Sequence, residues 1–296
     1  MDFSRESYTD FAEVYDEFMD NTPYEEWCSR LVQIIDKYGI SKPVRAVSGT
    51  HGMQEMVQNE AQETDQDGTE VSEEEQALAS ERNLVLDLGC GTGTLTELMA
   101  DAGYDMMGID MSYDMLQIAM DKQAQSGHDI MYLCQDMREL ELYCTVGTVI
   151  CICDSINYVL EEEEVIETFR RVNNYLFPKG LFIFDFNTDY KYAEVIGDTT
   201  IAENREDCSF IWDNFYDEES HINEYDLTIF VREDEEMDVF RRFQETHFQR
   251  GYNLQEMMHF VKAAGLEFVA AIDADTDDEV TEVTERVLMV CREKGK

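Results

Sequence analysis

Four acidic residues between positions 87 and 154 each stand where a run of apolar residues ends. They are Asp87, Asp110, Asp136 and Asp154. One aspartate after a strand is commonplace because turns favour this residue, but four in successive units are hard to attribute to chance. The carboxyl ends of parallel strands share one edge of a sheet, where such folds bind ligands. Because a carboxylate can accept hydrogen bonds from two hydroxyls, the pattern predicts a site for a ribose-bearing ligand.

The first of these aspartates leads into a glycine-rich turn. Its glycines stand at alternate positions, Gly89, Gly91 and Gly93. A residue without a Cβ lets the backbone approach a ligand closely or adopt a positive φ. A dinucleotide loop needs its third glycine where Thr94 stands, and no lysine follows as a loop for nucleoside triphosphates requires. The turn predicts a nucleotide-like ligand of another class, unless it is only a connector between strand and helix.

The segments around this turn alternate between strand and helix patterns. We expect strands at 83–88, 105–110, 129–134, 146–153 and 180–186, and helices at 93–102, 113–125 and 161–176. Asn253 and Glu256 form a capping-box pattern that opens a later helix, and strands are expected after it at 266–272 and 286–292. This alternation predicts an α/β fold with a doubly wound, mostly parallel seven-stranded sheet.

Two segments before the first strand differ from the core. Residues 1–40 read as helices with aromatic stripes, of which Tyr8, Phe11, Tyr15 and Phe18 form the first. Such stripes are usually core contacts, and the alternative is a lid over the ligand. Residues 41–82 are rich in Asp and Glu and poor in large apolar residues. We therefore expect an acidic, flexible insertion there.

A third segment interrupts the core between 188 and 250. It holds short β-prone runs at 208–212, 225–231 and 239–243, separated by acidic turns. Runs of this kind predict antiparallel strands. The expected domains are thus a helical lid, an acidic insertion, the α/β core, an antiparallel β insertion and the end of the core, at 1–40, 41–82, 83–187, 188–250 and 251–296.

The charge of the chain bears on its partners. It carries 66 acidic and 22 basic residues, a formal net charge of −44. Such a field repels phosphate backbones, so nucleic acid is disfavoured as a substrate. No apolar run is long enough for a membrane span, and the first residues lack the order of a signal peptide, so we expect a cytoplasmic protein. The eight cysteines are scattered without zinc-like spacing, and no metal is expected.

The glycine-rich turn and the aspartates after the strands resemble the class I S-adenosylmethionine (SAM)-dependent methyltransferases. Asp154-Ser155-Ile156-Asn157-Tyr158 and the later stretch from Arg242 to Tyr252 resemble motifs of a little-characterised group of small bacterial cytoplasmic methyltransferases. The resemblance covers most of the chain except 41–82. It implies SAM as the cofactor, held by Tyr8, Tyr15, Asp87, Gly89, Cys90, Gly91, Gly93, Asp110, Met111, Asp136, Met137 and Asp154.

The resemblance also implies an acceptor site. Ser155, Asn157, Tyr158, Trp212 and Arg250 are the candidates for contact with the substrate. Methyl transfer depends mainly on in-line alignment, and a general base is optional. If one is used, the candidates are Tyr158 and His247, with Tyr15 behind them.

The function expected on these grounds is transfer of a methyl group from SAM to a small molecule by in-line displacement, in a monomer or homodimer. The alternatives are an RNA, tRNA or protein methyltransferase that works with a partner, and a non-catalytic SAM-binding module. An NAD-dependent oxidoreductase is disfavoured by the glycine spacing.

Overall fold

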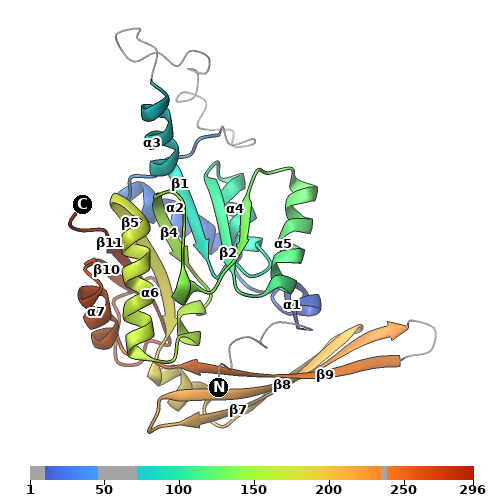
Figure 1. Ribbon diagram of the computed structural model, residues 1–296. Helices are drawn as coiled ribbons and strands as arrows, with labels where there is room; N and C mark the ends of the chain where they lie inside the picture. The colour runs from blue at the N-terminus through green and yellow to red at the C-terminus, as the bar shows by residue number, and fades with distance from the viewer. Residues whose placement is uncertain (1–10, 46–71, 235–238) are drawn as a thin grey trace.

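The core strands form a twisted sheet in the order β10-β11-β5-β4-β1-β2-β3. The computed structural model describes residues 11–45, 72–234 and 239–296 (Figure 1). Strands β1 to β5 pair in parallel, while β11 runs antiparallel to both β5 and β10. The predicted doubly wound, mostly parallel sheet of seven strands is confirmed.

The bounds of these strands lie close to the predicted ones. They are β1 (Leu84–Leu88), β2 (Asp105–Asp110), β3 (Met131–Cys134), β4 (Val146–Cys151), β5 (Leu176–Asn187), β10 (Glu267–Asp273) and β11 (Arg286–Arg292). The helices that follow or flank them are α4 (Thr94–Asp101), α5 (Tyr113–Ser126), α6 (Glu162–Tyr175) and α7 (Leu254–Ala263). The capping box predicted at Asn253 and Glu256 opens α7.

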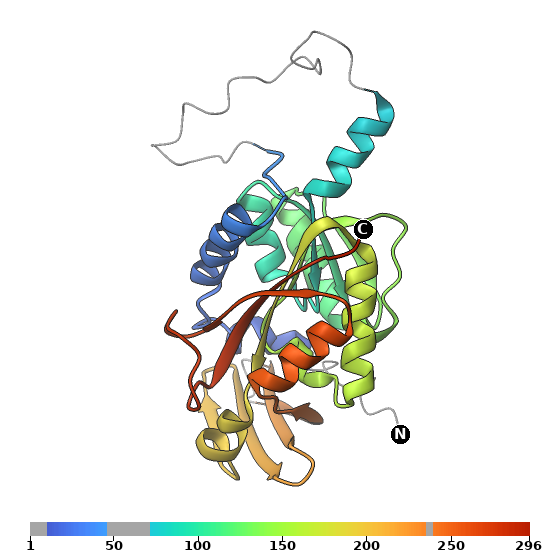
Figure 2. The same cartoon turned by 90° about the vertical axis from the view of Figure 1, so that its left-hand side faces the viewer.

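Both faces of the sheet are buried, which explains the nearly continuous apolar runs of its strands. In β5, Phe182 and Phe184 belong to the apolar cluster on one face, and Leu181 and Ile183 belong to the cluster on the other. Helices α6 and α7 cover the first face, and α2 (Tyr24–Tyr38) and α4 cover the second (Figure 2). Because β1 to β5 run parallel, their carboxyl ends lie at the same edge of this sheet.

The expected antiparallel insertion after β5 is a second sheet, with strands in the order β6-β7-β8-β9. After a short π-helical turn, η4 (Lys191–Ile196), come β6 (Thr200–Asn204), β7 (Cys208–Asp217), β8 (Ile222–Asp234) and β9 (Val239–Arg250). This sheet lies across the carboxyl edge of the core sheet (Figure 1). The strands are longer than the β-prone runs predicted, because neighbouring strands pair through polar positions as well.

Helix α1 (Ala12–Phe18) lies between the two sheets (Figure 1). Its Val14 is buried against Cys208, Leu227 and Ile229 of the second sheet. Phe11 and Phe18 of the aromatic stripe pack against the same cluster. The stripe is therefore a core contact, and it also holds the helix beside the carboxyl edge of the core sheet. Tyr8, the first member of the stripe, lies outside the described residues.

The expectation of a flexible insertion over 41–82 needs correction at its end. Residues Glu73–Asn83 form helix α3, which opens with a capping box between Ser72 and Glu75. Near its other end, the Glu81 carboxylate accepts hydrogen bonds from the Thr145 backbone and hydroxyl. The cap and this long-range contact offset the weak apolar character on which the prediction depended. Residues 46–71 lie outside the described part of the chain.

None of the helices in the described part of the chain combines the length and apolar character needed to cross a bilayer.

Candidate active site

The turn after β1 is built for close approach to a ligand. Gly89, Gly91 and Gly93 all have positive φ, at 81°, 54° and 75°. A Cβ added to Gly89 would lie 2.7 Å from the Ser155 hydroxyl oxygen, so a larger residue would close the gap between this turn and the segment after β4. A Cβ at Gly91 would meet nothing within 4 Å. The turn is therefore tight on one side and open on the other.

Asp110 fixes the far side of the same turn. Its carboxylate accepts hydrogen bonds from the backbone N–H of Gly91 and of Ser112, each at 2.8 Å. Burial raises the pKa of this carboxyl, and the two donors oppose the rise because they stabilise the charged form. A carboxylate offers about four lone-pair sites, so Asp110 can bind further donors while it holds the turn.

Asp87 lies deeper, at the end of β1. Its side chain is buried and accepts a hydrogen bond of 2.6 Å from the Thr96 hydroxyl. Burial raises its pKa to about 7, the Thr96 hydrogen bond opposes this, and the charge of Asp110 adds to it. At neutral pH this carboxyl is therefore divided between its charged and neutral forms.

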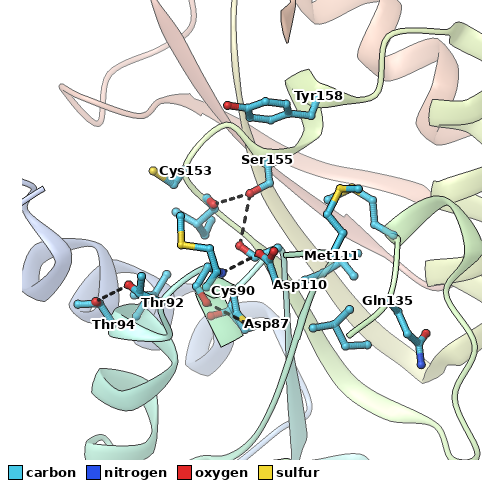
Figure 3. Close-up of a pocket in the computed structure, with 18 of the residues that line it drawn as sticks. Asp87, Cys90, Thr92, Thr94, Asp110, Met111, Gln135, Cys153, Ser155 and Tyr158 are labelled. Atoms are coloured by element: carbon cyan, nitrogen blue, oxygen red, sulfur yellow. Dashed lines mark hydrogen bonds between the residues drawn. The ribbon is translucent and has the colours of Figure 1, made fainter. Parts of the chain in front are cut away.

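A cavity extends from the glycine turn between the core and α1 (Figure 3). Asp87 and Asp110 lie in the wall of this cavity. Seven more of the predicted cofactor residues also line it: Tyr15, Gly89, Cys90, Gly91, Met111, Asp136 and Met137. Ser155 and Tyr158, predicted to contact the substrate, also line it. In Figure 3 Tyr158 lies on the side of the cavity away from Asp87.

At the Met111 end the cavity meets a charged pair that the sequence did not suggest. Asp136 caps the short turn η2 (Met137–Glu139) by accepting from the Arg138 backbone N–H, and it also pairs with the Arg138 guanidinium, Nη2 to Oδ2, at 2.6 Å. The carboxylate is thereby held in one orientation. Arg138 itself lines the cavity, next to Gln135.

Helix α1 is fastened to the glycine turn by one aspartate. Asp16 accepts a hydrogen bond of 2.7 Å from the Thr92 hydroxyl and pairs with the Lys122 ammonium, Nζ to Oδ2, at 2.6 Å. Lys122 also donates to Thr92 and Thr94. The helix, whose Tyr15 faces the cavity, is therefore docked directly on the turn. The sequence showed the aromatic stripe but gave no signal for this polar contact.

The segment after β4 is strained. Cys153 and Asp154 have positive φ, at 69° and 50°, a backbone conformation unfavourable for residues other than glycine. Both backbone N–H groups donate to the buried carboxylate of Asp185, at 3.2 and 2.8 Å. Asp185 in turn faces Arg286 at 3.4 Å. This carboxylate thus holds the turn that directs Cys153, Ser155 and the following residues toward the cavity.

The same turn directs one predicted cofactor residue away from the cavity. Asp154 does not line the cavity, and its carboxylate accepts a hydrogen bond from the Gln249 amide of β9. The positive φ turns its side chain toward the second sheet, which the position of an aspartate after a strand cannot reveal. Gly93 does not line the cavity either. A Cβ added to Gly93 would point toward the Tyr132 hydroxyl instead.

Three predicted substrate residues make contacts within the protein and lie outside the cavity wall. Asn157 is buried and its amide donates to the backbone oxygens of Asn187 and Arg250. The guanidinium of Arg250 donates to the Leu160 backbone oxygen and pairs with Glu162. Trp212 packs on Tyr225, with ring centroids 4.9 Å apart. None of the three lines the cavity.

The cavity wall also includes residues that the sequence assigned elsewhere. Tyr24 and Trp27 of α2 line it, although neither was named as a cofactor or substrate residue, and Trp27 is nearly buried. Cys153 lies near the hydroxyl of Tyr15, and burial raises the pKa of its thiol, which keeps it neutral and weakly nucleophilic. A covalent cysteine mechanism is therefore disfavoured.

Comparisons with known proteins agree with this geometry. The sequence profile described as "Methyltransferase domain" matches residues 85–180. The Bacillus subtilis (strain 168) protein named "Putative methyltransferase YqeM" is 31% identical over 281 residues, covering 95% of this chain and 94% of its own. The chain belongs to the SAM-dependent methyltransferases. It is accordingly an enzyme whose cofactor is SAM.

Solved structures share the fold of this methyltransferase. A SAM-dependent methyltransferase from Clostridium acetobutylicum aligns with a TM-score of 0.75 at 23% identity, over 97% of this chain and 99% of that one. CalS10 of Micromonospora echinaspora, an amino pentose methyltransferase solved with SAM, aligns with a TM-score of 0.54 at 18% identity, over 74% and 86% of the two chains.

The residues of the cavity fit SAM. The cofactor carries a positive sulfonium, a ribose with two hydroxyls and a flat adenine. The buried carboxyl group of Asp87 and the half-buried carboxylate of Asp110 complement the charge and the hydroxyls, and the open side of Gly91 leaves room for a ligand beside the backbone. Apolar side chains, among them Leu88, Ile109 and Met137, supply the rest of the surface.

Proposed function

We propose that this methyltransferase acts on a small molecule that binds between the core and the second sheet. The supporting observation is the position of Tyr158, which lines both the cavity of the glycine turn and a larger groove beside it. The far side of that groove is formed by residues of β7 to β9, including Phe215, Glu224 and Phe248. An acceptor in the groove would reach the cofactor site past Tyr158.

The size of the acceptor is argued from the docked helix. Tyr15 of α1 forms part of the cavity wall, and Asp16 fastens this helix to the glycine turn, so the helix limits access to the cavity from its own side. An acceptor that enters from the groove must fit beside the docked helix, which favours a small molecule or a thin extension of a larger one. An amino pentose is the acceptor class named for CalS10, which shares only the fold.

The charge of the groove narrows the acceptor class. Nine carboxylates line it against two guanidinium groups, and both of these are already paired, Arg138 with Asp136 and Arg171 with Glu167. Together with the net charge of −44, this field repels phosphorylated and other anionic acceptors. We infer that the acceptor is neutral or cationic.

The protein's own contribution to catalysis is alignment and exclusion of water. When bound, SAM supplies a methyl group already activated by its sulfonium. Asp110 holds the glycine turn in place, and Tyr15 of α1 covers part of the cavity. Positioning of this kind can contribute roughly 7 to 11 kcal/mol of barrier lowering in favourable cases.

Cofactor binding is tested with Asp110. We expect Asp110→Ala to weaken SAM binding by about 100-fold or more, because hydrogen bonds to a charged acceptor contribute about 1.5 to 3 kcal/mol each. Asp110→Asn, which keeps the shape and one acceptor oxygen, should show a smaller loss. Titration calorimetry measures both, and circular dichroism checks that the variants are folded. Unchanged affinity in Asp110→Ala would refute the assignment.

The acceptor class is tested by release of S-adenosylhomocysteine. Fractions of a cell extract are separated into a low-molecular-mass filtrate, protein and RNA, and each is incubated with the enzyme and SAM. We expect release with the filtrate, and expect added salt to raise the KM for a cationic acceptor because it screens the groove. Release with the protein or RNA fraction alone would refute a small-molecule acceptor.

A further inference from the structure

A row of polar side chains leads from the cavity wall into the second sheet. It begins with Tyr158, the last residue of the short helix η3 (Ser155–Tyr158). The Tyr158 hydroxyl lies 2.6 Å from the Tyr225 hydroxyl and 3.2 Å from Nδ1 of His247. Nε2 of His247 then lies 3.2 Å from the Glu245 carboxylate. The row thus connects the cofactor cavity with a buried acid.

The second sheet places these residues by its register. Tyr225 of β8 is directly opposite His247 of β9, and their rings stack 5.0 Å apart at an angle of 8°. Glu245 stands two positions before His247, on the same face of the strand. His247 is 1% exposed and Glu245 is 7% exposed. Burying a carboxyl group and an imidazole costs free energy unless the two groups interact with each other or with other polar groups. Their burial side by side therefore indicates that the fold holds them in this position.

The carboxylate determines where the protons lie. The Glu245 carboxylate lies 3.2 Å from Nε2 of His247, but the two groups do not meet in the geometry of a hydrogen bond. A negative charge beside Nε2 still favours the imidazole form with hydrogen on that nitrogen. Nδ1 of the neutral ring is then an acceptor for the Tyr158 hydroxyl, and Tyr225 donates to the Tyr158 oxygen. This assignment follows from the charge of Glu245 and from the roles that it leaves to the two hydroxyls.

We propose that Tyr158 accepts a proton from the methyl acceptor and passes its own proton to His247, with Glu245 as the positioning residue. The inference rests on the proposed function. The nucleophilic atom of the acceptor forms a bond to the methyl group and loses its bond to hydrogen. That proton moves to the Tyr158 oxygen while the phenol proton moves to Nδ1 of His247. The electron pair of the former sulfur–methyl bond stays on sulfur.

The arrangement selects a class of acceptor. The nucleophile must have a proton to lose, as a hydroxyl or an ammonium group does. A hydroxyl loses it during methyl transfer, and an ammonium loses it beforehand so that the nitrogen lone pair can attack. The imidazolium that forms at His247 is stabilised by the Glu245 carboxylate, as in the carboxylate–histidine pairs of hydrolases.

Glu245 also connects the row with the cover of the cavity. Its carboxylate accepts a hydrogen bond of 2.9 Å from the backbone N–H of Phe11, the residue just before α1. The same helix is fastened to the glycine turn through Asp16. Docking of α1 therefore contributes to the orientation of the carboxylate that sets the His247 proton.

The first test needs no acceptor. The full chain is labelled with ¹⁵N-histidine, and the signals of His247 are assigned from their loss in His247→Gln. We expect hydrogen on Nε2 and an unprotonated, hydrogen-bonded Nδ1 at neutral pH. Glu245→Gln should shift the ring toward a mixture of the two neutral forms, and Tyr158→Phe should move the Nδ1 signal. Hydrogen on Nδ1, or no response to Glu245→Gln, would overturn the proposal.

The chain offers a matched control elsewhere. Glu97 pairs with His128 at 2.8 Å on the surface of α4, away from the cavity. Glu97→Gln should alter the signals of His128, leave those of His247 unchanged, and leave methyl transfer unchanged. This control separates a general effect of losing a carboxylate from an effect specific to the row.

The second test uses turnover with the active filtrate. We expect Tyr158→Phe to lower kcat by about 10²- to 10⁴-fold, the usual range for loss of a general base, with SAM affinity near that of the wild type. Glu245→Gln should lower kcat without raising KM. A Tyr158→Phe enzyme with wild-type kcat would overturn the proposal. Failure of the filtrate to support turnover by the wild-type enzyme would instead refute the proposed function.

The two acceptor chemistries are distinguished by blocking amines. Reductive methylation of the filtrate with formaldehyde modifies primary and secondary amines and leaves hydroxyls intact. Loss of S-adenosylhomocysteine release after this treatment identifies an amine acceptor, and continued release identifies a hydroxyl. In both cases turnover must depend on Tyr158. Turnover independent of Tyr158 with either acceptor would overturn the proton transfer.

Discussion

The buried carboxyl of Asp87 predicts an unusual pH dependence of stability. Its pKa is about 7 in the folded protein against an ordinary value of 3.8, and burial is the main cause. A folded-state pKa above the unfolded one means that the native protein binds the proton more tightly. The stability contributed by this group is therefore fully present below about pH 4 and is lost as the pH rises through about 7.

The magnitude follows from the shift. With pKa values of about 7 and 3.8, linkage gives a loss of about 2 to 3 kcal/mol between pH 5 and pH 8. Asp87→Asn has no proton to lose, and Thr96 can still donate to its amide oxygen. The variant should therefore gain about 2 to 3 kcal/mol relative to the wild type over the same interval. The repulsion due to the net charge of −44 affects both proteins and cancels.

Urea unfolding followed by tryptophan fluorescence measures this difference, since Trp27 and Trp212 report on both the core and the second sheet. The measurement is made without cofactor at pH 5, 6, 7 and 8. The quantity of interest is the free energy of unfolding of Asp87→Asn minus that of the wild type. If this difference stays constant across the interval, burial does not perturb Asp87 as argued.

Two further predictions concern the glycine turn and the helix docked on it. Gly89→Ala should abolish SAM binding in calorimetry, because a φ of 81° is unfavourable for alanine and the added Cβ would clash with Ser155. Gly127→Ala is the control, since it has a φ of 77° and nothing within 4 Å of its Cβ, and it should lower only the stability of the fold. Equal losses of SAM affinity in the two variants would contradict this prediction. Asp16→Asn should weaken SAM binding by about tenfold, as the loss of one charge-assisted contact implies. It should also expose α1 to limited proteolysis, because the contact with Lys122 and Thr92 then lacks the negative charge of Asp16. Wild-type affinity and protease resistance would argue against a fastened helix.

Local patterns predicted most of the core. Asp87 and Asp110 follow fully buried strands, and parallel neighbours must end at the same edge, so their convergence could be read from the chain. The three glycines likewise predicted a tight turn, which their positive φ values confirm. The helix α3 escaped prediction because its stability comes from a cap and from the distant Thr145 rather than from an apolar face.

The direction of single side chains could not be predicted in the same way. Asp154 occupies the expected place after β4, yet the carboxylate of Asp185 draws its backbone into a positive φ and turns its side chain toward Gln249. Asn157 and Arg250 match motif positions but satisfy backbone groups in the interior. A motif reports residue types, whereas the fold decides which polar groups need partners.

By itself, the sequence determined the class of the fold, the edge of the sheet at which the predicted cofactor residues gather and the methyltransferase family, because strand period, glycine spacing and acidic strand ends are local properties. Only the tertiary structure decided that Tyr158, Tyr225, His247 and Glu245 form one row and that α1 closes on the turn. Tyr158 and His247 are separated by 89 residues, and their contact depends on the register of β8 with β9 and on the packing of the second sheet under η3. Contacts of this kind arise when the two sheets and the helices between them pack together. A short stretch of sequence carries no information about that packing.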